Sequence, residues 1–268
     1  MRLLAAAEGA EFHVPTIAEL FEWVPFATYK LAGITFHLSW MIVFLFATVA
    51  LLTLIWVIGF ANFKLVPSGL QNFLEVGVDF VRENIVHPTI GPEGERFMPF
   101  LTSMFFFVFS LNVLGIIPGI QFPITSRMAF PAFLALLSYV LFLFVGIRSQ
   151  GFGHYFGGIM FPSGVPKPIY LILTPVEVLS TLIFRPLTLA VRLFANMVAG
   201  HVMLAIFFGA TAYFLLHGEG ILLRVLSPFP FVMSIILVGF ELFIAGIQAF
   251  IFTILTAVYI AGAMHPEH

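Results

Sequence analysis

Residues 38–63 read LSWMIVFLFATVALLTLIWVIGFANF, a stretch of 26 residues without a single ionisable side chain. An α-helix needs about 20 consecutive apolar residues to cross the hydrocarbon core of a bilayer. This stretch is long enough and apolar enough to do so, and it predicts a membrane-spanning helix. We therefore expect an all-α integral membrane protein.

The composition of the whole chain supports the same class. Of its 268 residues, 61% are hydrophobic and 9% are charged, whereas a soluble domain carries about 25% charged residues. The 35 phenylalanines exclude a disordered chain. A net charge of −2 offers no basic surface to nucleic acid. The absence of cysteine excludes disulfides, cysteine-ligated metals and thiol catalysis.

Four further apolar stretches follow the first, at residues 97–119, 129–147, 169–216 and 225–264. The last two contain 48 and 40 residues. At about 1.5 Å per residue, straight helices of these lengths would be about twice as long as the hydrocarbon core is thick. Each stretch could split into two spans or form one long, steeply tilted helix, and hydropathy leaves both alternatives open.

Residues 68–90 have a different pattern, in which apolar residues recur at helical spacing and the charged residues Glu75, Asp79, Arg82 and Glu83 occupy the other face. This pattern predicts an amphipathic helix lying on the membrane surface. Residues 1–36 are expected to form a polar or interfacial segment, and residues 148–168 a Gly/Pro-rich loop. Residues 37–268 are predicted to form a single membrane domain.

The ionisable residues inside the predicted spans all lie on the last two stretches: Glu177, Arg185, Arg192, His201 and Glu241. Charged groups in spanning segments mark ion pathways by default. If the two stretches form an antiparallel hairpin closed around residue 221, positions whose numbers sum to about 442 face each other. His201 is then level with Glu241, and Gln248 lies near Arg192 and Asn196.

These residue types differ in what they can do with a proton. A histidine beside a carboxylate can pass a proton in either direction. Arginine stays protonated, so Arg192 would instead hold a fixed positive charge that favours the ionised form of any carboxylate near it. The chain offers no obvious permanent partner for Arg192. We therefore hypothesise that its carboxylate belongs to another subunit.

Structural roles are the alternatives for each of these residues. Arg185, and less plausibly Arg192, could extend to an interface. His201 and Glu241 could form a buried hydrogen bond, Asn196 and Gln248 could join helices, and Glu177 could be an interfacial carboxylate. At the level of the whole protein, a haem carrier would need a second deep histidine, a secondary transporter would often show an internal repeat, and no protease or P-loop motif occurs.

Residues 185–201, RPLTLAVRLFANMVAGH, closely resemble the signature of subunit a of F-type ATP synthases, the membrane stator that carries protons past a rotating c-ring. The final stretch, with Glu241, Gln248 and Tyr259, is similar to the last helix of that family. Residues 66–72, VPSGLQN, resemble the start of its surface helix. The resemblance covers roughly residues 35–264.

The resemblance implies five membrane crossings, with the last two helices long, strongly tilted and curved around the c-ring. It assigns Arg192 the essential charge that faces the c-ring carboxylate. It also implies two half-channels, one open to the outside with His201, Glu241, Gln248 and Asn196, and one on the cytoplasmic side with Glu177 and Thr188. The spacing from Glu177 to Pro186 is one residue longer than the family pattern.

The implied partners are the c-ring, the subunit b stalk, the rest of the ATP synthase complex and the lipid bilayer. The implied location is the bacterial plasma membrane, which the protein crosses several times. The resemblance implies no cofactor and no metal site, and it leaves nucleotide chemistry to other subunits.

Overall fold

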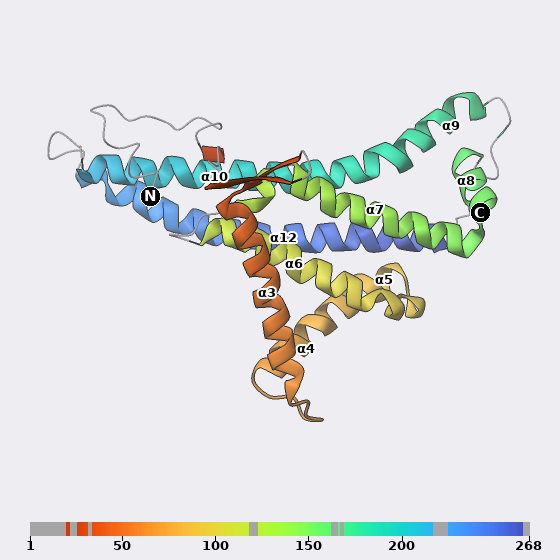
Figure 1. Ribbon diagram of the computed structural model, residues 1–268, viewed down its shortest axis with the longest axis horizontal. Helices are drawn as coiled ribbons and strands as arrows, with labels where there is room; N and C mark the ends of the chain where they lie inside the picture. The colour runs from red at the N-terminus through yellow and green to blue at the C-terminus, as the bar shows by residue number, and fades with distance from the viewer. Residues whose placement is uncertain are drawn as a thin grey trace. The chain divides into compact units, whose positions relative to one another are not determined.

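The computed structural model describes residues 20–21, 26–31, 34–117, 123–161, 166, 169–216 and 225–264 (Figure 1). Five helices in this part of the chain are long and apolar enough to cross a membrane: Trp40–Ala61, Pro92–Ile116, Ala129–Gln150, Tyr170–Leu215 and Pro228–Met264. The prediction of an all-α, multi-pass membrane protein is therefore confirmed. The two longest apolar stretches each form one continuous helix rather than two spans.

The predicted amphipathic helix begins with α4 (Leu70–Val81), which buries Gln71, Leu74 and Val81. Gly69 precedes it with a φ of 63°, a left-handed conformation that glycine adopts without steric cost. The Gln71 amide fixes the turn, since its Oε1 accepts from the backbone N–H of Lys64 at 3.1 Å and its Nε2 donates to the Lys64 carbonyl at 2.9 Å. The amphipathic helix is thus anchored at its start.

Two π-helical segments interrupt the helices, and each stands directly before an X-Pro step. They are η1 (Arg82–Val86), which continues α4, and η5 (Ser180–Phe184). Proline lacks an N–H, and its ring clashes with the carbonyl four residues earlier in an α-helix. The wider i→i−5 turn, closed by bonds such as that from the Arg185 N–H to the Ser180 carbonyl, relieves this clash. Pro88 and Pro186 are thereby accommodated without ending the helices.

A cluster of charged side chains connects the surface helix to the next span. Arg82 contacts Asp79 at 2.6 Å and Glu95 at 3.0 Å, and His87 contacts the same Glu95 oxygen at 3.0 Å. Glu95 belongs to the short 3-10 helix η2 (Pro92–Phe97), which leads into α6 (Met98–Ile116). These contacts join residues on both sides of α5 (His87–Thr89).

The chain divides into two compact units. The first unit contains Met1–Leu51, Phe109–Arg127 and Ala195–Ile247, and the second contains Leu52–Val108, Met128–Phe194 and Gln248–His268. Four helices run from one unit into the other: α3 (Trp40–Ala61), α6, α10 (Arg185–Leu216) and α12 (Pro228–Met264).

In the first unit, a β-hairpin precedes α3. Strand β1 (Ala27–Leu31) pairs antiparallel with β2 (Ile34–Leu38), and Ala27 lies opposite Leu38. These residues fall largely in the segment predicted to be polar or interfacial, for which we predicted no strand. Five-residue strands leave a weaker signal in the sequence than a 22-residue span.

In the second unit, the last turns of α7 (Ala129–Gln150) and α12 are held together by polar contacts. Gln150 Nε2 donates to the Ala263 carbonyl at 2.7 Å, and Ser149 Oγ donates to the Met264 carbonyl at 3.4 Å. These bonds satisfy carbonyls that a helix end leaves without an intrahelical partner. The apolar core of the unit includes Leu101, Phe142, Ile260 and their neighbours.

The prediction of a Gly/Pro-rich loop at residues 148–168 is wrong for part of this stretch, because residues Phe152–Met160 form the helix α8. Gly151, with a φ of 81°, ends α7 and allows the chain to turn into α8. The ring of Tyr155 then packs on Gly146, where an added methyl carbon would lie within 2.7 Å of the ring. This tertiary contact holds a segment that local composition predicted to be irregular.

Candidate functional site

In the first unit, Glu241 of α12 lies directly against Gly200 of α10. A methyl carbon added at Gly200 would come within 2.8 Å of the carboxyl carbon of Glu241, and its Oε1 would be closer still. The side chain of Glu241 is 9% exposed. A buried carboxylate in a spanning helix is costly, and here the absence of a side chain at position 200 makes room for it.

His201 follows Gly200 and is 6% exposed. Its imidazole hydrogen-bonds to the backbone of Gly115 on α6, and the ring of Phe21 lies with its centroid 5.5 Å away. The other ring nitrogen, Nδ1, is enclosed and has no hydrogen-bond partner in the described part of the chain. Three helices of the first unit therefore contribute to one buried polar region.

The sequence places His201 level with Glu241, and the structure brings Glu241 against the residue next to His201. The two side chains nevertheless form neither a hydrogen bond nor an ion pair with each other, although both residues are described. Adjacent residues on an α-helix project about 100° apart. Glu241 occupies the Gly200 side of α10, while the imidazole turns toward Gly115.

A second polar group lies one helical turn from Gly115. Thr125 Oγ1 donates to Asn112 Oδ1 at 3.2 Å, and both residues are buried. The amide nitrogen of Asn112 is enclosed and finds no partner among the residues that the structure describes. Buried polar atoms are normally hydrogen-bonded, so two unpaired ones in the same unit are unusual.

In the second unit, Arg192 is exposed on α10. Leu189 and Leu193, which project about 60° and 100° away from Arg192 around the same helix, are buried. Within the described residues, no carboxylate forms an ion pair with Arg192. The fixed positive charge is therefore presented on an outward face of a membrane-spanning helix.

Arg185, one end of the same signature, is placed differently. Its guanidinium carbon lies 5.2 Å from the centroid of the Tyr259 ring, in a cation–π arrangement. The side chain is half-buried and therefore contacts α12 within the protein. In the predicted antiparallel hairpin, residues whose numbers sum to about 442 face each other. This rule places Arg185 within one helical turn of Tyr259, so the contact could have been predicted from the sequence.

The remaining predicted site residues are distributed over both units. Gln248 is buried in the second unit, and Asn196 is exposed in the first. Thr188 is exposed, and its hydroxyl donates to the Phe184 carbonyl at 2.7 Å. Glu177 is half-buried on α9 (Tyr170–Leu179).

The π-helical segment η5 lies between Glu177 and Arg185. A π turn contains one residue more than an α turn, because its hydrogen bonds run from i to i−5. The π-helical segment therefore lies within the Glu177–Pro186 stretch, for which the resemblance predicts one extra residue. Downstream of it, α10 continues without interruption from Arg185 to Leu216.

Comparison with known proteins places the chain in a family. The family model described as ATP synthase A chain matches residues 40–261. The chain belongs to this family. It is 45% identical to ATP synthase subunit a of Frankia alni over 231 residues, which cover 84% of the chain and 76% of that relative. It is 42% identical to ATP synthase subunit a of a Parafrankia species over 264 residues, covering 98% of the chain and 87% of the relative.

Two glycines of the chain that lie at close helix contacts were not predicted as site residues. Gly200 admits the Glu241 carboxylate, as described above, and Gly115 packs so closely on α10 that an added methyl carbon would lie 3.1 Å from Met197 Sδ. For Gly200, the sequence signal was its position next to His201, the residue that the predicted hairpin places level with Glu241. In the described residues, no group of three histidine or acidic side chains could hold a metal ion.

Proposed function

We propose that this chain is the proton-translocating stator subunit of an ATP synthase. It would supply two aqueous half-channels and one arginine that acts on the carboxylate of a rotating c-ring. Membership of the ATP synthase A chain family and the five spanning helices support this role.

The observation that carries the proposal is the position of Arg192. Its charge is exposed on a spanning helix, and no described carboxylate neutralises it. A fixed positive charge at membrane depth is costly unless an anion comes to it. A c-ring carboxylate that moves past Arg192 would lose its proton there, and the permanent charge would prevent protons from passing directly between the two half-channels.

The two half-channels are assigned by the resemblance of these residues to the family. On the outer side, Glu241 and His201 would deliver protons to the ring, and Asn196 of the same unit would line their path. Gln248 is assigned to this half-channel by its resemblance to the family. Since His201 and Glu241 form no hydrogen bond with each other, the proton would pass between them through water. On the cytoplasmic side, Glu177 and Thr188 would line the exit.

The partners follow from this role. The exposed face with Arg192 would meet the c-ring, and other surfaces would contact subunit b and the rest of the complex within the bacterial plasma membrane. The chain itself would carry no nucleotide chemistry.

The decisive experiment replaces Arg192 by alanine in the assembled complex. We expect Arg192→Ala to abolish ATP synthesis and ATP-driven proton pumping in membrane vesicles while the complex still assembles. Arg148→Ala, which removes a charge from the last turn of α7, is the control and should pump normally. Pumping by the Arg192→Ala complex would contradict the proposal, and proton flux through this chain alone, without a c-ring, would favour a transporter.

A further inference from the structure

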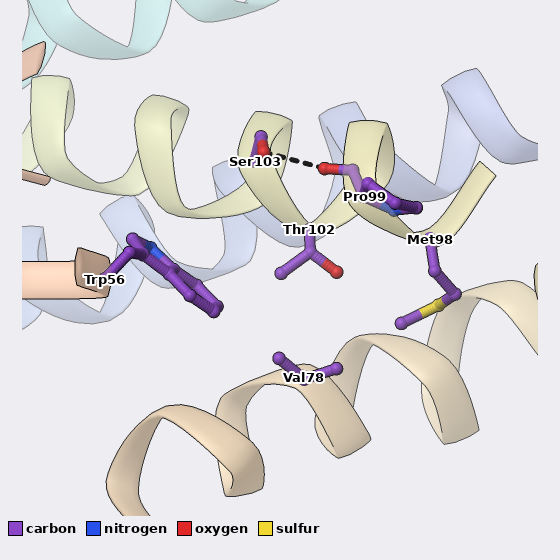
Figure 2. Close-up of a pocket in the computed structure, with 6 residues that line it drawn as sticks. All are labelled: Trp56, Val78, Met98, Pro99, Thr102 and Ser103. Atoms are coloured by element: carbon purple, nitrogen blue, oxygen red, sulfur yellow. Dashed lines mark hydrogen bonds between the residues drawn. The ribbon is translucent and has the colours of Figure 1, made fainter. Parts of the chain in front are cut away.

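A pocket of about 320 Å³ lies in the second unit, between the surface helix and the spans α3 and α6 (Figure 2). Its lining residues are Trp56, Val78, Met98, Pro99, Thr102 and Ser103, and none of them is charged. The charges that a passing carboxylate would meet lie instead on α10. Arg185 and Arg192 both belong to this helix and to the second unit, but their surroundings differ.

The two arginines leave α10 on almost the same face. They are seven residues apart, so at 100° per residue their side chains project only about 20° from each other, about 10.5 Å apart along the helix axis. Nevertheless, Arg192 is exposed and Arg185 is half-buried. The other exposed α10 residues of this unit are the uncharged Leu187, Thr188 and Val191. Among the described residues of the second unit, Arg192 is therefore the only charged side chain that α10 exposes.

Tyr259 of α12 accounts for this difference. The guanidinium carbon of Arg185 lies 5.2 Å from the centroid of the Tyr259 ring, within the ~6 Å over which a ring face attracts a cation. The ring is itself held by the core, since its centroid lies 5.8 Å from that of Phe142, which is 1% exposed. The backbone of Arg185 is also fixed, because its N–H closes the π turn on the Ser180 carbonyl. The Tyr259 ring thus keeps Arg185 turned toward α12.

A cation–π contact holds a guanidinium in place without neutralising it. Arginine stays protonated, so without the ring Arg185 would be free to turn to the open face of α10 as a second fixed positive charge. A carboxylate close to such a charge is kept ionised. Arg185 lies in the chain between Glu177 and Thr188, the residues assigned to the cytoplasmic half-channel, where a ring carboxylate takes up its proton during ATP-driven pumping.

We propose that Tyr259 is a positioning residue that sequesters the charge of Arg185, so that a passing c-ring carboxylate meets one cation, Arg192, rather than two. This inference rests on the proposed function. A second cation in the cytoplasmic half-channel would oppose proton uptake by the carboxylate. During ATP synthesis the carboxylate releases its proton into the same half-channel, and a cation favours that step. Loss of the ring should therefore slow pumping more than synthesis.

The test compares ATP-driven proton pumping with ATP synthesis in membrane vesicles, both normalised to the amount of assembled complex. Tyr259→Leu removes the ring and should lower pumping about ten-fold, since one desolvated cation–π contact shifts an equilibrium by about 30-fold. ATP synthesis should fall less. Tyr259→Met is a second variant without the ring, with a side chain that fills irregular space, and it should behave in the same way. Tyr259→Phe keeps the ring face and should retain pumping.

A double variant separates the charge of Arg185 from the packing of Tyr259. Tyr259→Leu combined with Arg185→Gln has the same missing ring but no released charge, so it should recover most of the pumping. The inference is overturned by wild-type pumping in both ringless variants, by equal losses of pumping and synthesis, or by a double variant that does not recover. Each of these results leaves the proposed function standing as long as Arg192→Ala does not pump, whereas pumping by Arg192→Ala overturns the proposed function itself.

Discussion

The approach of Glu241 to α10 depends on the missing side chain of Gly200, and this dependence can be tested by Gly200→Ala. The new methyl carbon would lie 2.8 Å from the carboxyl carbon of Glu241, where ordinary contact begins near 3.4 Å, so the carboxyl group must retreat by at least about 0.6 Å. Because the clash is with the end of a flexible side chain, it can be relieved by rotating Glu241 without moving either helix.

The expected effects on stability and on transport differ in size. Alanine stabilises a helix interior by up to about 1 kcal/mol relative to glycine, which offsets part of the ~1–3 kcal/mol that overpacking costs. The net loss of stability should therefore stay below about 2 kcal/mol. Proton transfer requires hydrogen-bond reach, and a misplacement of about 1 Å can reduce a rate about 100-fold. We expect proton pumping to fall at least about 10-fold.

The assay is ATP-driven acidification of inverted membrane vesicles that contain the assembled complex, followed with a pH-sensitive dye and normalised to the amount of complex. Gly239→Ala is the matched control, since it lies on α12 two residues from Glu241 and an added methyl carbon would have no atom within 4 Å. Equal pumping by the Gly200→Ala and Gly239→Ala complexes would refute the reasoning that the position of the carboxylate limits transport.

Two further predictions concern the site and the fold. The double variant His201→Glu with Glu241→His should recover part of the pumping lost in either single variant, because it keeps one acid and one imidazole in the buried region; no recovery would indicate a structural role. Gly146→Ala should lower the free energy of unfolding by about 1–3 kcal/mol, and with it the melting temperature of the purified complex, because the rigid Tyr155 ring cannot rotate away. Gly153→Ala, where the added methyl carbon meets open space, should leave it unchanged or slightly raised, and the reverse order would contradict the described packing.

The sequence by itself determined the membrane class, the first three spanning helices and the amphipathic helix. These features can be predicted because the bilayer requires each span to be apolar over a fixed length and to satisfy its own backbone hydrogen bonds. Such requirements act on one continuous stretch at a time. The signature around Arg192 could likewise be recognised from the sequence, because it lies within 17 consecutive residues.

The tertiary structure decided what depends on residues far apart in the chain. The sequence allowed residues 169–216 to form one helix or two, and it gave no sign that α8 would form where Tyr155 packs on Gly146. It also suggested a direct His201–Glu241 pair, whereas the structure places the carboxylate over Gly200. The physical reason is that a helical segment is specified by its own residues, while the orientation of a polar side chain is specified by the neighbouring helix that leaves room for it.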